Sequence, residues 1–236
     1  TYMRHTVTLT LVGLLLLGTS CSETLNVQGT TSLSELENRT LHLKVFDGND
    51  FRSIDSARVV HGKFGFRADV DTAVQTRLFV DSDPRAIMPI ILDGNPISVV
   101  ITENEQRVEG SPVNDSLRNF ITQFEDLRQR FLRLPRLEAQ LILQGIDPAE
   151  ASARMLDEQV AISNAHETLV MPFIRRHSND VLGPAAFMIV TSVMEAPTLT
   201  PWIEQIVTFA SPRFLADPYV NEFMRMARQN SQHDWH

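Results

Sequence analysis

The sequence predicts an α+β protein in which an N-terminal antiparallel β-sandwich is followed by a C-terminal helical region. Before Gly110, apolar and polar residues alternate as in half-buried strands, and after Gly110 apolar residues recur at helical spacing. In the second half we also interpret four polar residues that are each followed directly by proline as helix starts. We expect a signal peptide over residues 1–20, the β-sandwich over residues 21–110 and the helical region over residues 111–236.

The N-terminal segment has the layout of a secretory signal. Residues 7–17 form an apolar run, and small residues follow it up to Cys21. The run is shorter than the roughly 20 residues that a transmembrane helix needs, which argues against an uncleaved anchor helix. A cysteine directly after the small residues resembles a bacterial lipoprotein signal, in which the cysteine thiol is acylated. We therefore predict lipidation at Cys21, although Gly18 stands where such signals usually place Leu. Plain secretion is the alternative.

Short strands are predicted along the first half of the chain. Turn residues such as Asp47-Gly48 separate them, and regular short strands of this kind are typical of a sandwich or a barrel. Pro89 places its strand at an edge or a bulge, because proline cannot donate to a β-ladder. Residues 22–38 are compatible with a tether or a first strand. The predicted strands span residues 40–46, 54–60, 63–70, 75–80, 86–92, 97–101 and 106–109.

Helices are predicted along the second half. An apolar stripe runs along the first helix to Leu134, and Pro135 should kink or end that helix before the pattern continues to a stop at Gly145. The second helix has apolar positions from Met155 to Ile174, with Leu156 and Val160 among them. A short apolar helix is expected over residues 184–194. The helix starts are Ser111-Pro112, Asp147-Pro148, Thr200-Pro201 and Asp217-Pro218.

Composition and charge exclude some function classes. With 43% hydrophobic and 21% charged residues, the chain can bury an ordinary core. A net charge of -8 argues against nonspecific nucleic-acid binding, which needs Lys and Arg to neutralise phosphates. Acyl chains on Cys21 would supply the membrane affinity, because no polybasic patch is present. Since Cys21 is the only cysteine, its acylation would leave no thiol for disulfides, redox chemistry or a cysteine-based metal site.

The stretch from Thr40 to Leu117 resembles a known module. Its motifs are similar to the uncharacterised β-domain that begins many Bacteroidetes lipoproteins, ahead of a helical segment and a thioredoxin-like domain of the TlpA/ResA thiol-disulfide oxidoreductase type. The later motif Asp180-Val181-Leu182-Gly183 resembles their helical segment. In that family a Cys-x-x-Cys motif performs catalysis, and this sequence contains none, so no redox residue is carried over. The motifs that carry the resemblance are Phe46-Asp47-Gly48, Ile54-Asp55-Ser56-Ala57, the run from His61 to Phe66, the run from Pro89 to Ile97 and the run from Val108 to Asp115.

Metal ligation has few candidates. The segments Asp47–Asp50 and Asp81–Asp83 offer oxygen ligands of the kind calcium uses, but hairpin turns require the same residues and the EF-hand glutamate is absent. We therefore interpret both as turns. The histidines lack a third ligand at a suitable spacing, and we predict no metal site among them. They are His42 and His61 in the β half, His166 and His177 in the helical half, and His233 and His236 in a tail that we expect to fray.

No catalytic motif is present. The sequence lacks a Gly-x-Ser-x-Gly elbow, a phosphate loop and a HExxH motif, so we expect no catalytic, cofactor-binding or metal-binding residue. The adjacent carboxylates of Glu125 and Asp126 point to different helix faces. A basic cluster on the first helix is interpreted as a solvated face, with an acidic partner or lipid headgroups as the alternative. Its members are Arg128, Arg130, Arg133 and Arg136.

Two functions follow from these observations. The first is a membrane-anchored, noncatalytic binding or scaffold module of the cell envelope, which reaches the membrane through N-terminal acyl chains, engages an envelope protein partner and binds no nucleic acid. The alternative is the N-terminal portion or an accessory subunit of a thiol-disulfide oxidoreductase, whose thioredoxin-like domain is not in this chain.

Overall fold

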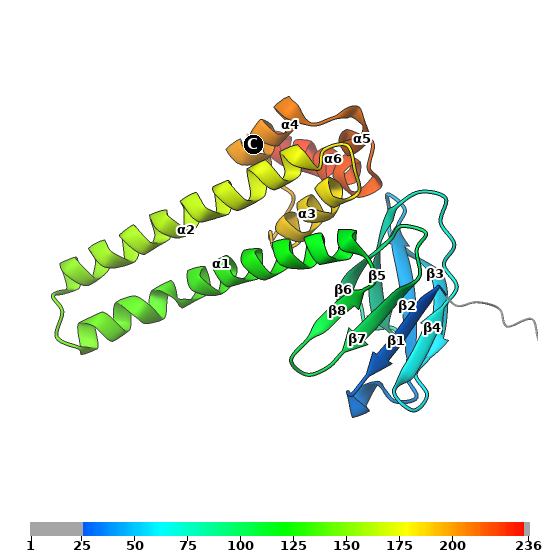
Figure 1. The fold of residues 1–236 in the computed structure, drawn as a ribbon. Helices are drawn as coiled ribbons and strands as arrows, with labels where there is room; N and C mark the ends of the chain where they lie inside the picture. The colour runs from blue at the N-terminus through cyan, green and yellow to red at the C-terminus, as the bar shows by residue number, and fades with distance from the viewer. Residues whose placement is uncertain (1–25, 234–236) are drawn as a thin grey trace, which may run out of the picture.

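Two four-stranded sheets pack face to face in the N-terminal part of the computed structural model, which describes residues 26–233 (Figure 1). The space between the sheets is filled by the apolar side of each strand, including Leu41, Leu78 and Ile90, which are fully buried. The strands are β1 (Val27–Thr31), β2 (Thr40–Phe46), β3 (Phe51–Arg58), β4 (Lys63–Phe66), β5 (Val74–Val80), β6 (Ala86–Leu92), β7 (Ile97–Ile101) and β8 (Gln106–Glu109).

The predicted sandwich is confirmed, with one departure from an antiparallel arrangement. One sheet has the order β4-β1-β7-β8 and the other has the order β3-β2-β5-β6. All pairs are antiparallel except β1 and β7, which run parallel with Val27 opposite Ile97. The segment before Asn38 therefore contributes a first strand. A 3-10 turn over Ser34–Leu36 connects that strand to the second sheet.

Two predicted strands differ from the structure by more than one residue. The strand expected over residues 54–60 begins earlier, at Phe51, and ends at Arg58. The strand expected over residues 63–70 ends at Phe66, because the backbone of Ala68 bonds to the Asn26 side chain rather than to a neighbouring strand. Asn26 accepts from the Ala68 amide and donates to the Ala68 carbonyl, at 2.8 Å in both cases.

Pro89 lies at a sheet edge, as predicted. Its strand, β6, pairs with β5 on one side, and helix α1 (Pro112–Leu143) lies beside it on the other. The buried side chain of Asn114 replaces a neighbouring strand there. Its amide oxygen accepts from the backbone N–H of Ile91, and its amide nitrogen donates to the carbonyl of the same residue, both at 2.8 Å. This contact fixes the start of α1 against the sandwich.

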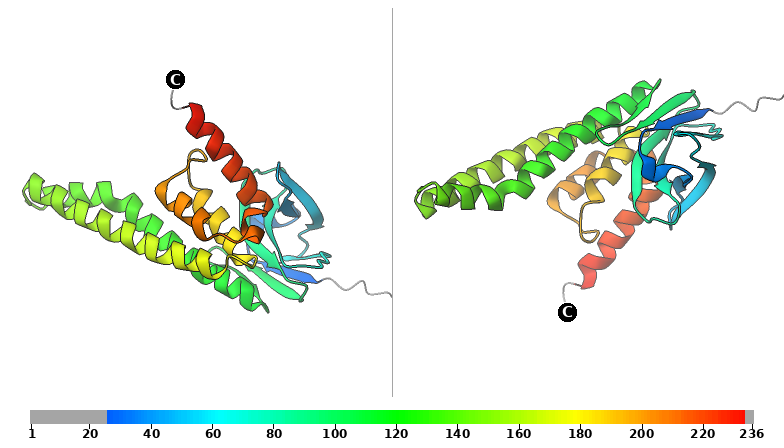
Figure 2. Two further views of the ribbon diagram at one scale, coloured as in Figure 1. Left: turned by 90° about the horizontal axis from the view of Figure 1, so that it is seen from above. Right: turned by 90° about the horizontal axis from the view of Figure 1, so that it is seen from below.

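The helical region consists of a long hairpin and a compact cluster of shorter helices. Helix α1 and helix α2 (Pro148–Arg176) form the hairpin, whose tip projects away from the sandwich in every view (Figures 1 and 2). Nine of the ten residues of α3 are buried, because it packs against α1, α2 and α6. The shorter helices are α3 (Leu182–Thr191), α4 (Pro201–Phe209), α5 (Pro212–Leu215) and α6 (Pro218–His233).

Pro135 was expected to kink or to end the first helix, and the structure shows that it does not end it. The helix continues to Leu143, eight residues further, and α2 likewise continues past Pro172 to Arg176. An internal proline costs about 3 kcal/mol or more. Packing along the hairpin offsets this cost, since Leu127 and Leu134 of α1 are buried against α2.

The other helix predictions agree with the structure to within a few residues. All four cap-and-proline starts begin helices, and the short apolar helix begins at Leu182 rather than at residue 184. Helix α5 was not predicted, although Ser211-Pro212 is a fifth pair of the same kind, in which the Ser211 hydroxyl accepts from the Phe214 amide at 3.1 Å. Among the described residues, no helix combines the length and the apolar character needed to cross a membrane. The predicted signal segment and Cys21 lie outside the described residues.

Candidate functional site

The acidic turns use their carboxylates locally, as their interpretation as turns predicts. The Asp47 side chain accepts from the amides of Asn49 and Asp50, and these bonds lower its pKa. Asp81 forms an ion pair with Arg39 and accepts from the Thr40 amide at 2.8 Å, with the pKa of its carboxyl again lowered. Within residues 26–233, no group of three or more His, Cys, Asp and Glu side chains could hold a metal ion.

The histidines lie in separate places. His42 is on β2, and His61 occupies the turn before β4 with a positive φ of 51°. His177 ends α2, where its Nδ1 lies 2.8 Å from a carboxylate oxygen of Asp180. His166 lines a surface groove. The terminal tail from residue 234 onward lies outside the described residues.

The arginine cluster divides into paired and unpaired members. Arg128 forms a bidentate pair with Glu125 on the same helix, and Arg130 pairs with Glu158 across the hairpin at 2.8 Å. Arg133 and Arg136 are exposed and have no ion-pair partner in the part of the chain that the structure describes. The pairing supports a solvated face along the hairpin.

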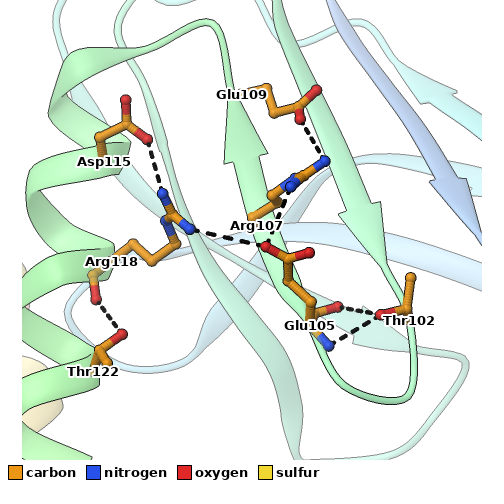
Figure 3. A network of polar contacts seen from close by, with 7 residues as sticks. All are labelled: Thr102, Glu105, Arg107, Glu109, Asp115, Arg118 and Thr122. Atoms are coloured by element: carbon orange, nitrogen blue, oxygen red, sulfur yellow. Dashed lines mark hydrogen bonds and ion pairs between the residues drawn. The ribbon is translucent and has the colours of Figure 1, made fainter.

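A second charged network links the sandwich to the helical region (Figure 3). Arg107 on β8 pairs with Glu109 at 2.7 Å and with Glu105 at 3.3 Å. Arg118 on α1 reaches Glu105 at 3.9 Å and Asp115 at 3.6 Å. The two arginines offset two of the three carboxylate charges, and the arrangement offers neither a nucleophile nor a general base poised beside one. We assign it a structural role at the start of α1.

An open apolar groove of about 360 Å³ lies between the hairpin and the turn from α3 to α4. We call it the hairpin groove. Its floor is buried, whereas Phe131 is 50% exposed and Val193 is 53% exposed at its rim. The His166 ring lies between Phe124 and Trp202, with ring centres 5.8 and 6.1 Å away. The residues that line the groove are Phe124, Leu127, Arg128, Phe131, Gln159, Ile162, Ser163, His166, Val190, Val193, Met194 and Trp202.

The hairpin groove corrects the sequence analysis on one point. The apolar stripes of the first two helices predict buried positions at Phe131, Leu156 and Val160, yet these side chains are 50%, 56% and 52% exposed. The hairpin extends beyond the compact cluster, so within residues 26–233 its outer half has only two helices and no third element covers these faces (Figure 1). The helical periodicity therefore identified the apolar face of each helix, but it did not distinguish buried positions from exposed ones.

A second hollow, of about 350 Å³, lies where the sandwich meets the helical cluster. We call it the junction pocket. It is lined by residues of β2 and β5, by the start of α3 and by the segment from Arg213 to Tyr219. Burial raises the pKa values of Asp217 and Tyr219 in this region. Its residues come from four separate stretches of the chain, so no local motif could have indicated it.

The comparisons with known proteins bear on the sandwich. Residues 25–117 match the model of a domain of unknown function, DUF4369. The DUF4369 match covers all eight strands and the first turn of α1, including Asn114, which bonds to the edge strand. It confirms that this part of the chain resembles an uncharacterised domain. No curated protein matches the chain.

Proposed function

We propose that this protein is a noncatalytic binding module of the cell envelope, held at a membrane by acyl chains on Cys21. The observation that carries the binding role is the hairpin groove. Side chains that a soluble protein normally buries, such as Phe131 and Val193, are half exposed there around a buried apolar floor. A hollow of about 360 Å³ with a mainly apolar lining is within the size range of binding sites.

The chemistry of the groove favours a protein partner with an apolar ridge, such as one face of an amphipathic helix. Phe131 and Trp202 are large aromatic groups of the type that dominates binding energy at interfaces. Met194 adds an adaptable apolar side chain. The groove runs between helices, which is the geometry that accepts a helix as ligand.

The position of the first strand is compatible with an anchor at Cys21. The described chain enters the sandwich at β1, and the hairpin tip lies at the opposite end of the molecule in all views (Figures 1 and 2). Residue 27 is only six positions beyond Cys21. An anchor there would hold the sandwich close to the membrane and direct the hairpin away from it.

The intact mass of the native protein, extracted from membranes, tests the anchor. We expect a mass that equals residues 21–236 plus acyl groups. An unlipidated mass would contradict the anchored part of the proposal. The Cys21→Ala variant serves as the control, because it should lose the acyl mass and leave the membrane fraction.

In vivo photo-crosslinking tests the groove. A benzophenone amino acid at position 131 should crosslink to an envelope protein, whereas the same group at position 132 should not, because Leu132 is 54% exposed but lies outside the groove. The Phe131→Ser variant should abolish the crosslink formed from position 193, and Leu132→Ser should preserve it. Equal crosslinking from positions 131 and 132 would contradict a specific groove.

An association with a thiol-disulfide oxidoreductase is the second candidate. It is favoured by the DUF4369 match at residues 25–117 together with the resemblance to lipoproteins that carry a thioredoxin-like domain. The same mass measurement tests it, since a native protein larger by a domain of roughly 100 residues or more would indicate a fused redox domain. A crosslinked partner with a Cys-x-x-Cys motif would indicate an accessory subunit.

A further inference from the structure

A further pocket on the hairpin gathers guanidinium groups. It has a volume of about 390 Å³ and is formed by the outer part of α1 together with one residue of α2. We call it the arginine pocket. It shares no residue with the hairpin groove. Three arginines line it against a single carboxylate, and its polar residues are Arg130, Arg133, Arg136, Gln140 and Glu158.

The one carboxylate of the arginine pocket is already engaged. Arg130 donates from Nε and from Nη2 to the same oxygen of Glu158, at 3.2 and 2.8 Å. The charge of Arg130 is therefore offset across the hairpin. Arg133 and Arg136 are exposed and have no ion-pair partner within residues 26–233. The pocket thus keeps two positive charges that the described chain does not compensate.

The nearest other carboxylates do not line the pocket. Glu138 accepts from the Ser152 hydroxyl across the hairpin at 2.6 Å. Asp126 is exposed and lies seven residues before Arg133, which is about 10 Å along the axis of a helix. Asp157 is exposed on α2, next to the carboxylate that is already paired. Charges on the surface are largely screened at about 10 Å in ordinary salt, so these groups leave the excess in the pocket intact.

The sequence around the pocket concentrates positive charge. Residues 130–137 contain three arginines and no acidic residue, although the net charge of the chain is -8. Residues three apart are neighbours on the surface of a helix, where like charges are destabilising. Arg118 and Arg128, on the same helix, each pair with a carboxylate three residues earlier. Arg133 and Arg136 have no such partner, so a bound anion would remove the repulsion between them.

The ligand that fits these groups has a doubly charged anionic end and a small apolar body. Guanidinium groups hold phosphate oxygens through pairs of parallel hydrogen bonds. A phosphate monoester carries a charge of about -1.5 to -2 at pH 7, which matches the two free arginines. Leu134 is buried and Leu137 is half-buried, and both give the pocket an apolar side for the carbon portion of an ester. The volume of about 390 Å³ lies within the range of small-molecule sites.

We propose that the arginine pocket binds a phosphate monoester. Arg133 and Arg136 hold the phosphate, Gln140 is a further donor, and the carbon portion of the ester lies against Leu137. The proposal is independent of the hairpin groove and of the anchor at Cys21, because it uses other residues. A soluble phosphate ester and a lipid with a terminal phosphate both present this chemical group.

Isothermal titration calorimetry with glycerol 3-phosphate at low ionic strength tests the proposal. The full chain with Cys21→Ala is used, because it carries no acyl group. We expect saturable binding of one ester per chain, which weakens as NaCl is added because the arginines are exposed. Acetate supplies one charge instead of two and should bind at least about tenfold more weakly. Equal binding of acetate would overturn the proposal, and tighter binding of a polyglutamate peptide would overturn it in favour of an acidic protein segment.

Vesicles distinguish the two sources of the phosphate. The same chain is sedimented with phosphatidylcholine vesicles that contain phosphatidic acid, and with vesicles of pure phosphatidylcholine. Sedimentation with the first kind alone would support a lipid headgroup as the ligand. A chain that stays in solution with both kinds, and binds glycerol 3-phosphate, would support a soluble ester. A chain that binds neither the vesicles nor the soluble ester would overturn the proposal.

Variants assign the binding to the two free arginines. Arg133→Gln and Arg136→Gln change exposed positions, and glutamine is a good helix former, so neither should prevent folding. Each should weaken the binding of the phosphate monoester about tenfold, as expected for the loss of a hydrogen bond between charged groups. Arg228→Gln is the matched control, because it removes the same charge from an exposed position on α6, which points away from the hairpin (Figure 2). An equal loss of affinity in all three variants would refute the site.

Discussion

Asn114 is the residue on which the junction between sheet and helix depends most directly. It is 4% exposed and satisfies both backbone groups of Ile91 at the free edge of β6. The same side chain donates to Ser111, the residue that caps α1, at 3.0 Å. The Asn114 amide therefore satisfies the unpaired backbone groups of an edge strand and sets the direction of the long helix. Satisfying these groups prevents the edge from pairing with another chain.

Replacing Asn114 by Ala should reduce the free energy of unfolding by about 2–4 kcal/mol, because two buried backbone groups lose their partner. Urea denaturation monitored by circular dichroism measures the change. Asn119→Ala, at an exposed site on the same helix, should be neutral or slightly stabilising. A loss below about 0.5 kcal/mol in Asn114→Ala would mean that the edge does not depend on this side chain.

His166 should make stability depend on pH. Burial in the hairpin groove lowers its pKa, since the charged imidazolium is disfavoured between Phe124 and Trp202. The unfolded chain then binds this proton more readily than the folded one, so the free energy of unfolding falls as pH drops through the ordinary value of about 6.5 and below.

The contribution of His166 can be isolated by difference. Between pH 7.5 and pH 5.5, the His166→Gln variant should lose less stability than the unmodified protein. His61→Asn is the control, because His61 is exposed and Asn tolerates its positive φ of 51°. An unchanged loss of stability in His166→Gln would show that other groups produce the pH dependence.

At the scale of elements, local sequence signals predicted where most helices begin. In the second half of the chain, each polar residue directly before a proline began a helix, since the proline occupies a position whose N–H needs no partner. The internal prolines were harder, because the energy that carries α1 past Pro135 comes from contacts with α2, about 30 residues away. The parallel pairing of β1 with β7 was equally inaccessible to local patterns, because it joins strands about 70 residues apart.

The close approach of α2 and α3 depends on Gly183. A Cβ atom there would overlap the carbonyl oxygen of His177, a backbone atom that cannot move away cheaply. We expect Gly183→Ala to destabilise the protein by roughly 1–3 kcal/mol, as for other overpacked sites. Gly145→Ala provides the comparison, because Gly145 has open space but a positive φ of 86°, and should cost only about 1 kcal/mol. Thermal unfolding of the two variants ranks them, and an equal or smaller loss for Gly183→Ala would contradict the overlap.

At the scale of the whole molecule, the fold class and the order of the elements could be predicted because period-2 and period-3.6 patterns occupy separate halves of the chain. The two hollows could not. The junction pocket joins Gln75 to Arg213, and the hairpin groove joins Phe131 to Trp202, and neither pairing leaves a trace in local sequence. Phe131 is exposed because no third helix among the described residues packs against the outer half of the hairpin, and the periodicity of the sequence does not report such a partner.

We expect the sandwich and the helices to fold as one unit, although the DUF4369 match ends at residue 117. Ile91 on the outer face of β6 is fully buried against Leu117, Leu182 and Ala185, and the ring centres of Phe46 and Tyr219 are 5.7 Å apart.

A fragment of residues 26–117 would expose this face to water. We expect it to bind the dye ANS and to self-associate in size-exclusion chromatography, whereas residues 26–233 stay monomeric. Ile91→Thr should reduce self-association of the fragment, because it removes an exposed apolar side chain. The same substitution should destabilise the longer chain, because Ile91 is a core residue there. A monomeric fragment without ANS binding would mean that the matched segment folds independently of the helices.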